Sequence, residues 1–280
     1  MMKYIEIKAP AKINIGLNIV EKRDDGFHNL ETFFYPIHDL YDKLIFELAE
    51  SFSFRCNEKS VNNDEDNLVL KSVRLLEEFT GKKFLVKIEL QKKIPIGAGL
   101  GGGSSDSAAT LISLNELFGL KISYETLVNL ALQLGSDVPF FLKAKPAIGK
   151  SRGDVLTIKE IDLPYQIVII NPGIHISTKE AFQNITPKKA KINYDDVFQS
   201  LDSFLNNKER IVNDFEEFVF TKHPEIQFIK ESLIKYGSEF SLMSGSGSTV
   251  YGLFKDKIEL DRLSAIFPKE YFIFISSSNN

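Results

Sequence analysis

The sequence contains the segment Pro95-Ile96-Gly97-Ala98-Gly99-Leu100-Gly101-Gly102-Gly103-Ser104-Ser105. Five of the seven residues from Gly97 to Gly103 are glycine, so we expect no regular helix or strand there. Ser104 and Ser105 are suitable N-caps for a helix predicted over Asp106–Phe118, which Gly119 ends. Glycine lets the backbone approach a ligand closely, and the N-terminus of a helix favours an anion. The segment therefore indicates a phosphate-binding loop rather than a hinge.

Three other kinds of phosphate loop fit less well. Gly97, Gly99 and Gly102 match the G-x-G-x-x-G spacing of a dinucleotide fold, but a second helix, not a strand, follows the first. The same spacing occurs in protein kinases, yet the sequence has no H-R-D or D-F-G. Gly149-Lys150-Ser151 imitates the end of a P-loop, but Ala144 stands where that motif needs its first glycine.

Composition excludes several functional classes. The 280 residues include 34 basic and 38 acidic side chains, so a net charge of -4 gives no general attraction to nucleic acid or anionic membranes. Cys56 is the one cysteine, and no Cys/His spacing suits zinc. The N-terminal residues are charged where a signal peptide is apolar, and no run of 18 apolar residues occurs. We expect a cytoplasmic protein with neither a nucleic-acid nor a membrane partner.

Hydrophobic patterning predicts an α+β protein. Period-two alternation near the N-terminus predicts strands at Tyr4–Ile7, Ile13–Ile19, Thr32–Ile37, Lys43–Leu48, Phe52–Cys56 and Phe84–Leu90. Helical spacing predicts helices at Asn67–Phe79, Tyr194–Leu205 and Glu209–Phe220. An α-β-β-α-β order closes the chain, over Pro224–Tyr236, Glu239–Met243, Thr249–Phe254, Lys257–Phe267 and Tyr271–Ile275. The change of pattern near residue 155 predicts two domains, 1–154 and 155–280.

Three segments together resemble the motifs of the GHMP kinase superfamily, which includes galactokinase, homoserine kinase, mevalonate kinase and phosphomevalonate kinase. They are Ala9-Pro10-Ala11-Lys12-Ile13-Asn14, Pro95–Ser105 and Leu242-Met243-Ser244-Gly245-Ser246-Gly247-Ser248. The resemblance implies a two-domain GHMP kinase fold, with an N-terminal ATP-binding domain, a C-terminal ferredoxin-like α/β sandwich domain and the active site between them. It also implies ATP as co-substrate and Mg²⁺.

Further segments resemble one branch of that family, which phosphorylates the 2-hydroxyl of a methylerythritol unit carried on cytidine diphosphate in non-mevalonate isoprenoid precursor biosynthesis. They are Asp25–His28, Glu65–Leu68, Leu134–Phe140 and Asn171-Pro172-Gly173. The alternatives are another small-molecule kinase of the homoserine or mevalonate type, and a non-catalytic nucleotide-binding relative. A small-molecule cytidyl diphosphate substrate is the expected partner, and the chain is expected to be a monomer or a homodimer.

The resemblance assigns catalysis to Lys12 and Asp137. Asp137 is then the carboxylate that removes or orients the hydroxyl proton, and Lys12 holds that carboxylate ionised and stabilises charge on the attacking oxygen. From the residues alone, Asp137 is as well suited to cap a short helix over Pro139–Leu142, and a lone strand lysine is often a solvated edge residue.

The resemblance also assigns binding residues. ATP is expected to contact Asn67 and the loop residues Pro95, Ile96, Gly97, Ala98, Gly99, Leu100, Gly101, Gly102, Gly103, Ser104 and Ser105. The acceptor is expected to contact Asn14, Phe27, His28, Phe182 and Gly245.

In this assignment Phe27 and Phe182 stack on cytosine and His28 bonds its edge, although relatives more commonly have Tyr where Phe27 stands. Phe27 can alternatively be a core residue of the next strand. Ser105 and Asp106 stand at the predicted helix start, but relatives often carry Asn or Ala where Asp106 stands, so the sequence assigns no Mg²⁺ ligand.

Overall fold

A computed structural model describes residues 3–61 and 66–277 of the chain. Glu65, which falls in one of the family-like segments, and the two N-terminal residues lie outside the described residues. The chain forms two compact units that are each discontinuous in sequence. Unit 1 comprises residues 1–11, 40–96 and 101–144, and unit 2 comprises residues 12–39, 97–100 and 145–280. The domain boundary expected near residue 155 stays a prediction, because compact units and family domains need not coincide.

Two long strands replace the four short ones expected near the N-terminus. β1 spans Tyr4–Lys22 and pairs with β2, which spans His28–Leu48. The alternation of apolar residues is broken at Pro10 in β1 and at His38-Asp39 in β2, which is why each strand resembles two in the sequence. Proline has no N–H to donate, and a sheet edge tolerates it. Both strands contribute residues to both units.

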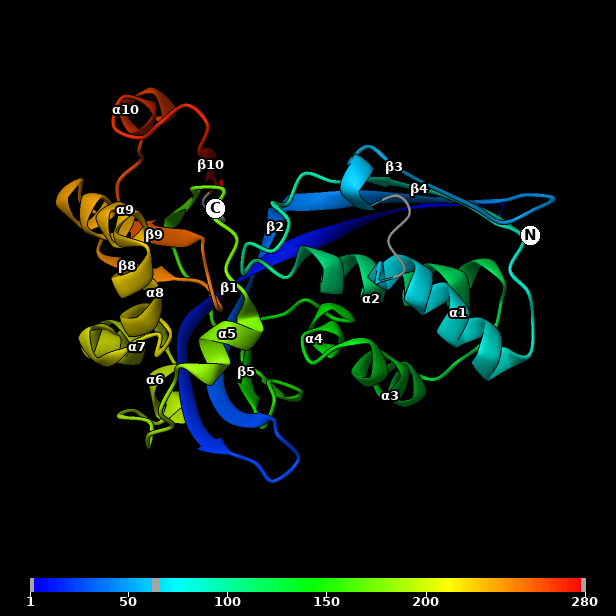
Figure 1. Ribbon diagram of the computed structural model, residues 1–280, viewed down its shortest axis with the longest axis horizontal. Helices are drawn as coiled ribbons and strands as arrows, with labels where there is room; N and C mark the ends of the chain where they lie inside the picture. Colours follow the sequence, from blue (N-terminus) through cyan, green and yellow to red (C-terminus); the bar gives the residue numbers. More distant parts are fainter. Residues whose placement is uncertain (1–2, 62–65, 278–280) are drawn as a thin grey trace. The chain divides into compact units, whose positions relative to one another are not determined.

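Unit 1 combines a small sheet with four helices. β4 (Val86–Gln91) pairs antiparallel with Lys43–Leu48 of β2 and parallel with β3 (Ser53–Cys56). The 3-10 helix η1 (Lys59–Val61) follows β3. The helices α1 to α4 lie on one side of β3 and β4 (Figure 1) and span Leu68–Thr80, Gly102–Leu117, Tyr124–Leu134 and Val138–Phe141. α2 packs against the other three helices, and its many Ala and Ser residues let it be buried on almost every side.

Unit 2 contains a four-stranded antiparallel sheet in the order β10-β7-β9-β8. These strands span Phe272–Ile275, Gln166–Asn171, Val250–Phe254 and Phe240–Met243. The helices α8 (Glu216–Lys222) and α9 (Pro224–Lys235) contact each other, and α9 packs on β8 and β9 (Figure 1). The predicted α-β-β-α-β order is confirmed, although the last helix, α10, is shorter than expected and covers Leu260–Ser264.

The remaining elements of unit 2 are short. β5 (Ala147–Lys150) pairs with Thr32–Phe34 of β2 and with β6 (Val155–Ile158). α5, α6, α7 and the 3-10 helix η2 span Thr178–Gln183, Tyr194–Val197, Leu201–Asn207 and Lys208–Arg210. The single helix predicted over Tyr194–Leu205 is wrong, because the Ser200 side chain accepts a hydrogen bond from the Ser203 N–H and starts a new helix. Among residues 3–61 and 66–277, no helix has both the length and the apolar character needed to cross a membrane.

Candidate active site

The glycine-rich segment is a loop as predicted, but the helix after it starts earlier than expected. α2 begins at Gly102, and Gly101 precedes it with a left-handed φ of 73°. The predicted N-cap role of Ser104 and Ser105 is therefore wrong, and both residues lie in the first helical turn. The reason is that glycine at position 101 adopts the left-handed conformation without strain, so no side-chain cap is needed there.

The start of α2 has the geometry of an anion site. The first helical hydrogen bond runs from the Ser105 N–H to the Gly101 carbonyl at 2.9 Å. The N–H groups of Gly102, Gly103 and Ser104 precede that bond, so helix geometry gives them no acceptor within α2. They lie at the positive end of the helix dipole, where a phosphate is favoured.

Lys12 is a buried residue of unit 2, and the solvated alternative is wrong. Its side chain is 3% exposed, and Nζ donates hydrogen bonds to Asn14 Oδ1 at 2.5 Å and to the Gly99 carbonyl at 3.1 Å. Nζ also lies 5.5 Å from the centre of the Phe34 ring. Lys12 and Asn14 share one face of β1, since side chains two residues apart in a strand point the same way.

The C-terminal glycine motif meets the other two motifs inside unit 2. Ser244 Oγ accepts a hydrogen bond from the Asn14 N–H at 3.1 Å and donates one to the Gly99 carbonyl at 2.9 Å. A Cβ on Gly245 would lie 3.3 Å from Gly99 Cα and 3.5 Å from Asn14 Oδ1. The three family-like motifs therefore meet in one hydrogen-bond network, the three-motif network. Each motif contributes to it, through Lys12 and Asn14, Gly99, and Ser244.

Other buried residues support this network, and the motifs in the sequence do not indicate them. Asn14 Nδ2 donates to Thr32 Oγ1 at 2.9 Å, and the Tyr251 hydroxyl donates to the Asn14 carbonyl at 3.0 Å. Asn213 Nδ2 donates to the carbonyls of Met243 and Gly245, each at 2.8 Å, which fixes the start of the C-terminal glycine loop. One feature of the sequence could have indicated a structural role for Asn213. It follows the apolar pair Ile211-Val212, and an amide side chain buried beside apolar residues needs a backbone partner.

The aromatic residues expected to bind cytosine lie in unit 2. Phe182, on α5, stacks on His28 with ring centres 5.0 Å apart and packs edge-on against Phe215 at 4.9 Å. Phe27 is 49% exposed, so the alternative of a core residue is wrong, and the Arg152 guanidinium lies 4.1 Å from the centre of its ring. Burial, helped by nearby Lys22, lowers the pKa of His28 and favours its neutral imidazole.

Asp137 and Asn67, both in unit 1, differ in what their side chains do. Asp137 occupies the N-cap position of α4, but its side chain makes no capping hydrogen bond to that helix. Asn67 does cap a helix: its Oδ1 accepts from the Val69 N–H of α1 at 2.8 Å, while Nδ2 donates to the Val61 carbonyl at 2.9 Å. An ATP contact by Asn67 stays a prediction.

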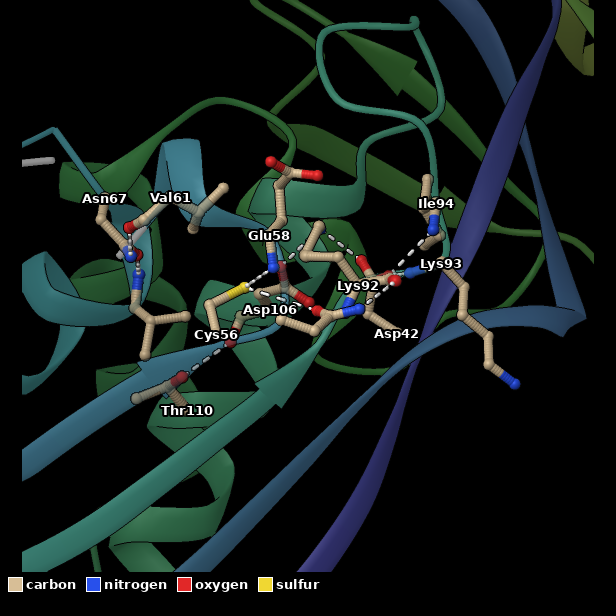
Figure 2. A network of polar contacts seen from close by, with 12 residues as sticks. Asp42, Cys56, Glu58, Val61, Asn67, Lys92, Lys93, Ile94, Asp106 and Thr110 are labelled. Atoms are coloured by element: carbon tan, nitrogen blue, oxygen red, sulfur yellow. Dashed lines mark hydrogen bonds and ion pairs between the residues drawn. The ribbon is translucent and has the colours of Figure 1, made fainter. Parts of the chain in front are cut away.

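Asp106 belongs to a buried ion cluster of unit 1 that the sequence did not suggest (Figure 2). Lys92 Nζ lies 2.7 Å from Asp106 Oδ2 and also bonds Asp42 Oδ2. The side chains of Lys92, Asp42 and Asp106 are 8%, 0% and 4% exposed. Burial raises the pKa of Asp106 to about 8, although the Lys92 charge opposes the shift. Among residues 3–61 and 66–277, no group of three or more His, Cys, Asp or Glu is placed to hold a metal ion.

Comparison with known proteins identifies the class. Residues 67–145 match the GHMP kinases N terminal domain, and residues 192–273 match the GHMP kinases C terminal domain. The chain belongs to the GHMP kinases, as the three-motif network already indicates.

Within that family the chain is similar over nearly its whole length to one kind of enzyme. The chain is 41% identical, over 97% of its length and 96% of the relative, to 4-diphosphocytidyl-2-C-methyl-D-erythritol kinase of Chlorobium phaeobacteroides strain BS1. A crystal structure of 4-(cytidine 5'-diphospho)-2C-methyl-D-erythritol kinase shares 32% identity and a TM-score of 0.76, covering 89% of this chain and 90% of that one. Homoserine kinase from Cytophaga hutchinsonii has the same TM-score at 18% identity, covering 99% of this chain and 96% of that one, which shows a shared fold.

Proposed function

We propose that the protein transfers the γ-phosphoryl group of ATP to the 2-hydroxyl of 4-diphosphocytidyl-2-C-methyl-D-erythritol, a step in the synthesis of isoprenoid precursors. The observation that carries this proposal is the three-motif network, in which Lys12 and Ser244 meet at the Gly99 carbonyl. The near full-length similarity to enzymes of that name supports the choice of acceptor.

ATP binding is assigned to the loop from Pro95 to Ser105. The N–H groups in the first turn of α2 face no helical acceptor, so they can bind phosphate oxygens. A Mg²⁺ ion bound to ATP would supply the positive charge that offsets the phosphates during transfer. Transfer is direct and in line, and it needs from the protein mainly positioning and charge stabilisation.

The acceptor hydroxyl is assigned to Lys12, Asn14 and Asp137. The Lys12 ammonium stabilises negative charge on the attacking oxygen, and the Asn14 amide bonds the polyol. Asp137, whose side chain does not cap α4, accepts or orients the hydroxyl proton. His28, Phe27 and Phe182 bind the cytosine, and the neutral imidazole of His28 offers both a donor and an acceptor to the base edge.

A substrate comparison tests this function. The protein is incubated with Mg-ATP and, in separate reactions, with the cytidyl substrate, mevalonate, homoserine or galactose, and ADP release is measured. We expect ADP release above the ATP-only rate with the cytidyl substrate alone. Release with homoserine or mevalonate instead would assign the protein to a sister kinase, and no release with any acceptor would favour a nucleotide-binding relative without activity.

Two substitutions test the catalytic assignment. Lys12→Met and Asp137→Asn should each lower kcat about 100-fold or more while ATP affinity changes little, because both groups act on the attacking oxygen. The matched control is Lys150→Met, which removes a half-exposed lysine paired with Asp195 and should leave kcat unchanged. Wild-type turnover in either variant would remove that residue from the mechanism.

A further inference from the structure

The Asp42–Lys92–Asp106 cluster lies at both ends of the glycine-rich loop (Figure 2). Lys92 is two residues before Ile94, where the chain enters the loop, and Asp106 is in the second turn of α2, where the chain leaves it. The proposed function uses this loop but assigns no role to the buried charges next to its two ends. All residues of the cluster belong to unit 1.

The segment before the loop is held by hydrogen bonds at each of its residues. Asp42 Oδ1 accepts from the backbone N–H of Lys93 at 2.5 Å and from that of Ile94 at 2.9 Å. The Asn57 side chain accepts from the Lys92 N–H at 2.7 Å and donates to the Lys92 carbonyl at 3.2 Å. Residues 92–94 are therefore held by hydrogen bonds made within the protein.

Lys92 joins this segment to the helix after the loop, because it bonds Asp106 of α2. Its Nζ donates to Asp106 Oδ2 at 2.7 Å, a charge-assisted bond between buried groups. The contact is close, since a Cβ on Gly102 would lie 3.2 Å from Lys92 Nζ and 3.1 Å from Ile94 Cγ2. The first turn of α2 consequently packs directly on the cluster.

We infer that Asp106 and Lys92 are positioning residues for ATP binding, which hold the first turn of α2 against residues 92–94. This inference rests on the proposed function in one respect, that the loop binds ATP. A phosphate site made of backbone N–H groups binds well only if those groups are already ordered, because ordering on binding subtracts from affinity. The hydrogen bond from the Lys92 ammonium to Asp106 supplies that order before ATP arrives.

Asp106→Ala is the most informative test. Lys92 keeps Asp42 as its partner in this variant, so no buried charge is left unpaired and the protein should fold. We expect the dissociation constant for Mg-ATP, measured by calorimetric titration without acceptor, to rise about tenfold. Asp106→Ser shortens the side chain while keeping it polar and should behave in the same way. Asp106→Asn keeps an oxygen for Lys92 and should restore affinity to within about twofold of wild type.

A second readout makes the test independent of ATP. Without any nucleotide, amide hydrogen exchange at residues 102–105 should be faster in Asp106→Ala than in wild type. The control is Leu117→Ala at the far end of α2, which removes a buried side chain and should lower stability without changing ATP affinity or exchange at residues 102–105.

The outcomes separate this inference from the proposed function. Wild-type ATP affinity together with wild-type exchange in Asp106→Ala would overturn the positioning role, and so would an equal loss of affinity in Leu117→Ala. A wild-type protein that does not bind Mg-ATP would overturn the kinase assignment. Faster exchange in Asp106→Ala would still support the inference that Asp106 and Lys92 hold the first turn of α2 against residues 92–94.

Discussion

Replacing Asp106 with Asn should change how the free energy of unfolding depends on pH. The Asp106 carboxyl faces Lys92 and Asp42, with the buried Cys56 thiol and Glu58 nearby, and its Oδ1 has no hydrogen-bond partner among the described residues. Burial raises its pKa from an ordinary value of 3.8 to about 8. The folded protein therefore keeps a proton that the unfolded chain releases, and stability falls as pH rises from about 4 to about 8.

The size of the effect follows from the pKa. Between the unfolded and folded pKa values, one retained proton lowers the unfolding free energy by about 1.4 kcal/mol per pH unit. From pH 5 to pH 7 the wild type should lose roughly 3 kcal/mol through Asp106, a loss that the amide of Asp106→Asn cannot show. The variant should therefore become more stable, relative to wild type, as pH rises.

Urea unfolding followed by circular dichroism at pH 5, 6 and 7 measures this difference directly. Ser113→Ala is the control, since it changes a buried, non-ionisable side chain on the same helix and should give a difference that is independent of pH. If the difference between Asp106→Asn and wild type is also independent of pH, then Asp106 is ionised throughout this range and the argument from burial is wrong.

Three further predictions concern the ligand sites. Phe27→Ala and Phe182→Ala should each raise the KM for the cytidyl substrate roughly ten- to hundred-fold through about 1–3 kcal/mol of lost stacking, and equal losses for ATP in a KM comparison would indicate a packing role instead. Gly103→Ala should weaken Mg-ATP binding in calorimetry while the circular dichroism spectrum stays that of wild type, and unchanged affinity would mean that no phosphate approaches this residue. Incubation with γ-labelled ATP alone should leave the protein unlabelled, because the transfer is direct, and a labelled protein would establish a phosphoenzyme.

Local sequence signals were sufficient for most of the fold. The helices α1 and α9 lie where helical spacing predicts them, and Gly81 ends α1 in the left-handed conformation. The errors arise where a backbone signal competes with a side-chain signal. Gly101 is the N-cap of α2, so the helix begins upstream of Ser104 and Ser105. Ser200 is the N-cap of α7 and divides a segment whose apolar spacing is helical throughout.

The candidate site was predictable only where its residues lie in short contiguous motifs. Lys12, Asn14 and Gly245 lie in such motifs, and the structure connects Lys12 and Asn14 by a direct hydrogen bond. The ion cluster could not be predicted, because Asp42 and Lys92 are 50 residues apart and each alone resembles an ordinary charged surface residue. Burial and pairing are properties of the folded chain.

The fold itself requires most of the glycines in the loop. Gly97, Gly99 and Gly101 have φ values of 64°, 78° and 73°, a conformation that residues with a Cβ rarely adopt. At Gly99 a Cβ would also lie 2.2 Å from the Ser244 carbonyl oxygen, and at Gly102 it would crowd Lys92. Glycine at these four positions is explained by backbone conformation and packing before any ligand is considered.

Gly103 is different, because neither backbone conformation nor packing requires glycine there. It lies in the first turn of α2 without a positive φ, it is exposed, and a Cβ there would make only an ordinary contact of 3.6 Å with Leu68 Cδ1. Alanine is favoured over glycine inside a helix by about 1 kcal/mol, so folding alone disfavours glycine at this position. We propose that close approach of a phosphate to the backbone accounts for glycine here, because the added methyl group would stand between the helix N–H groups and the anion.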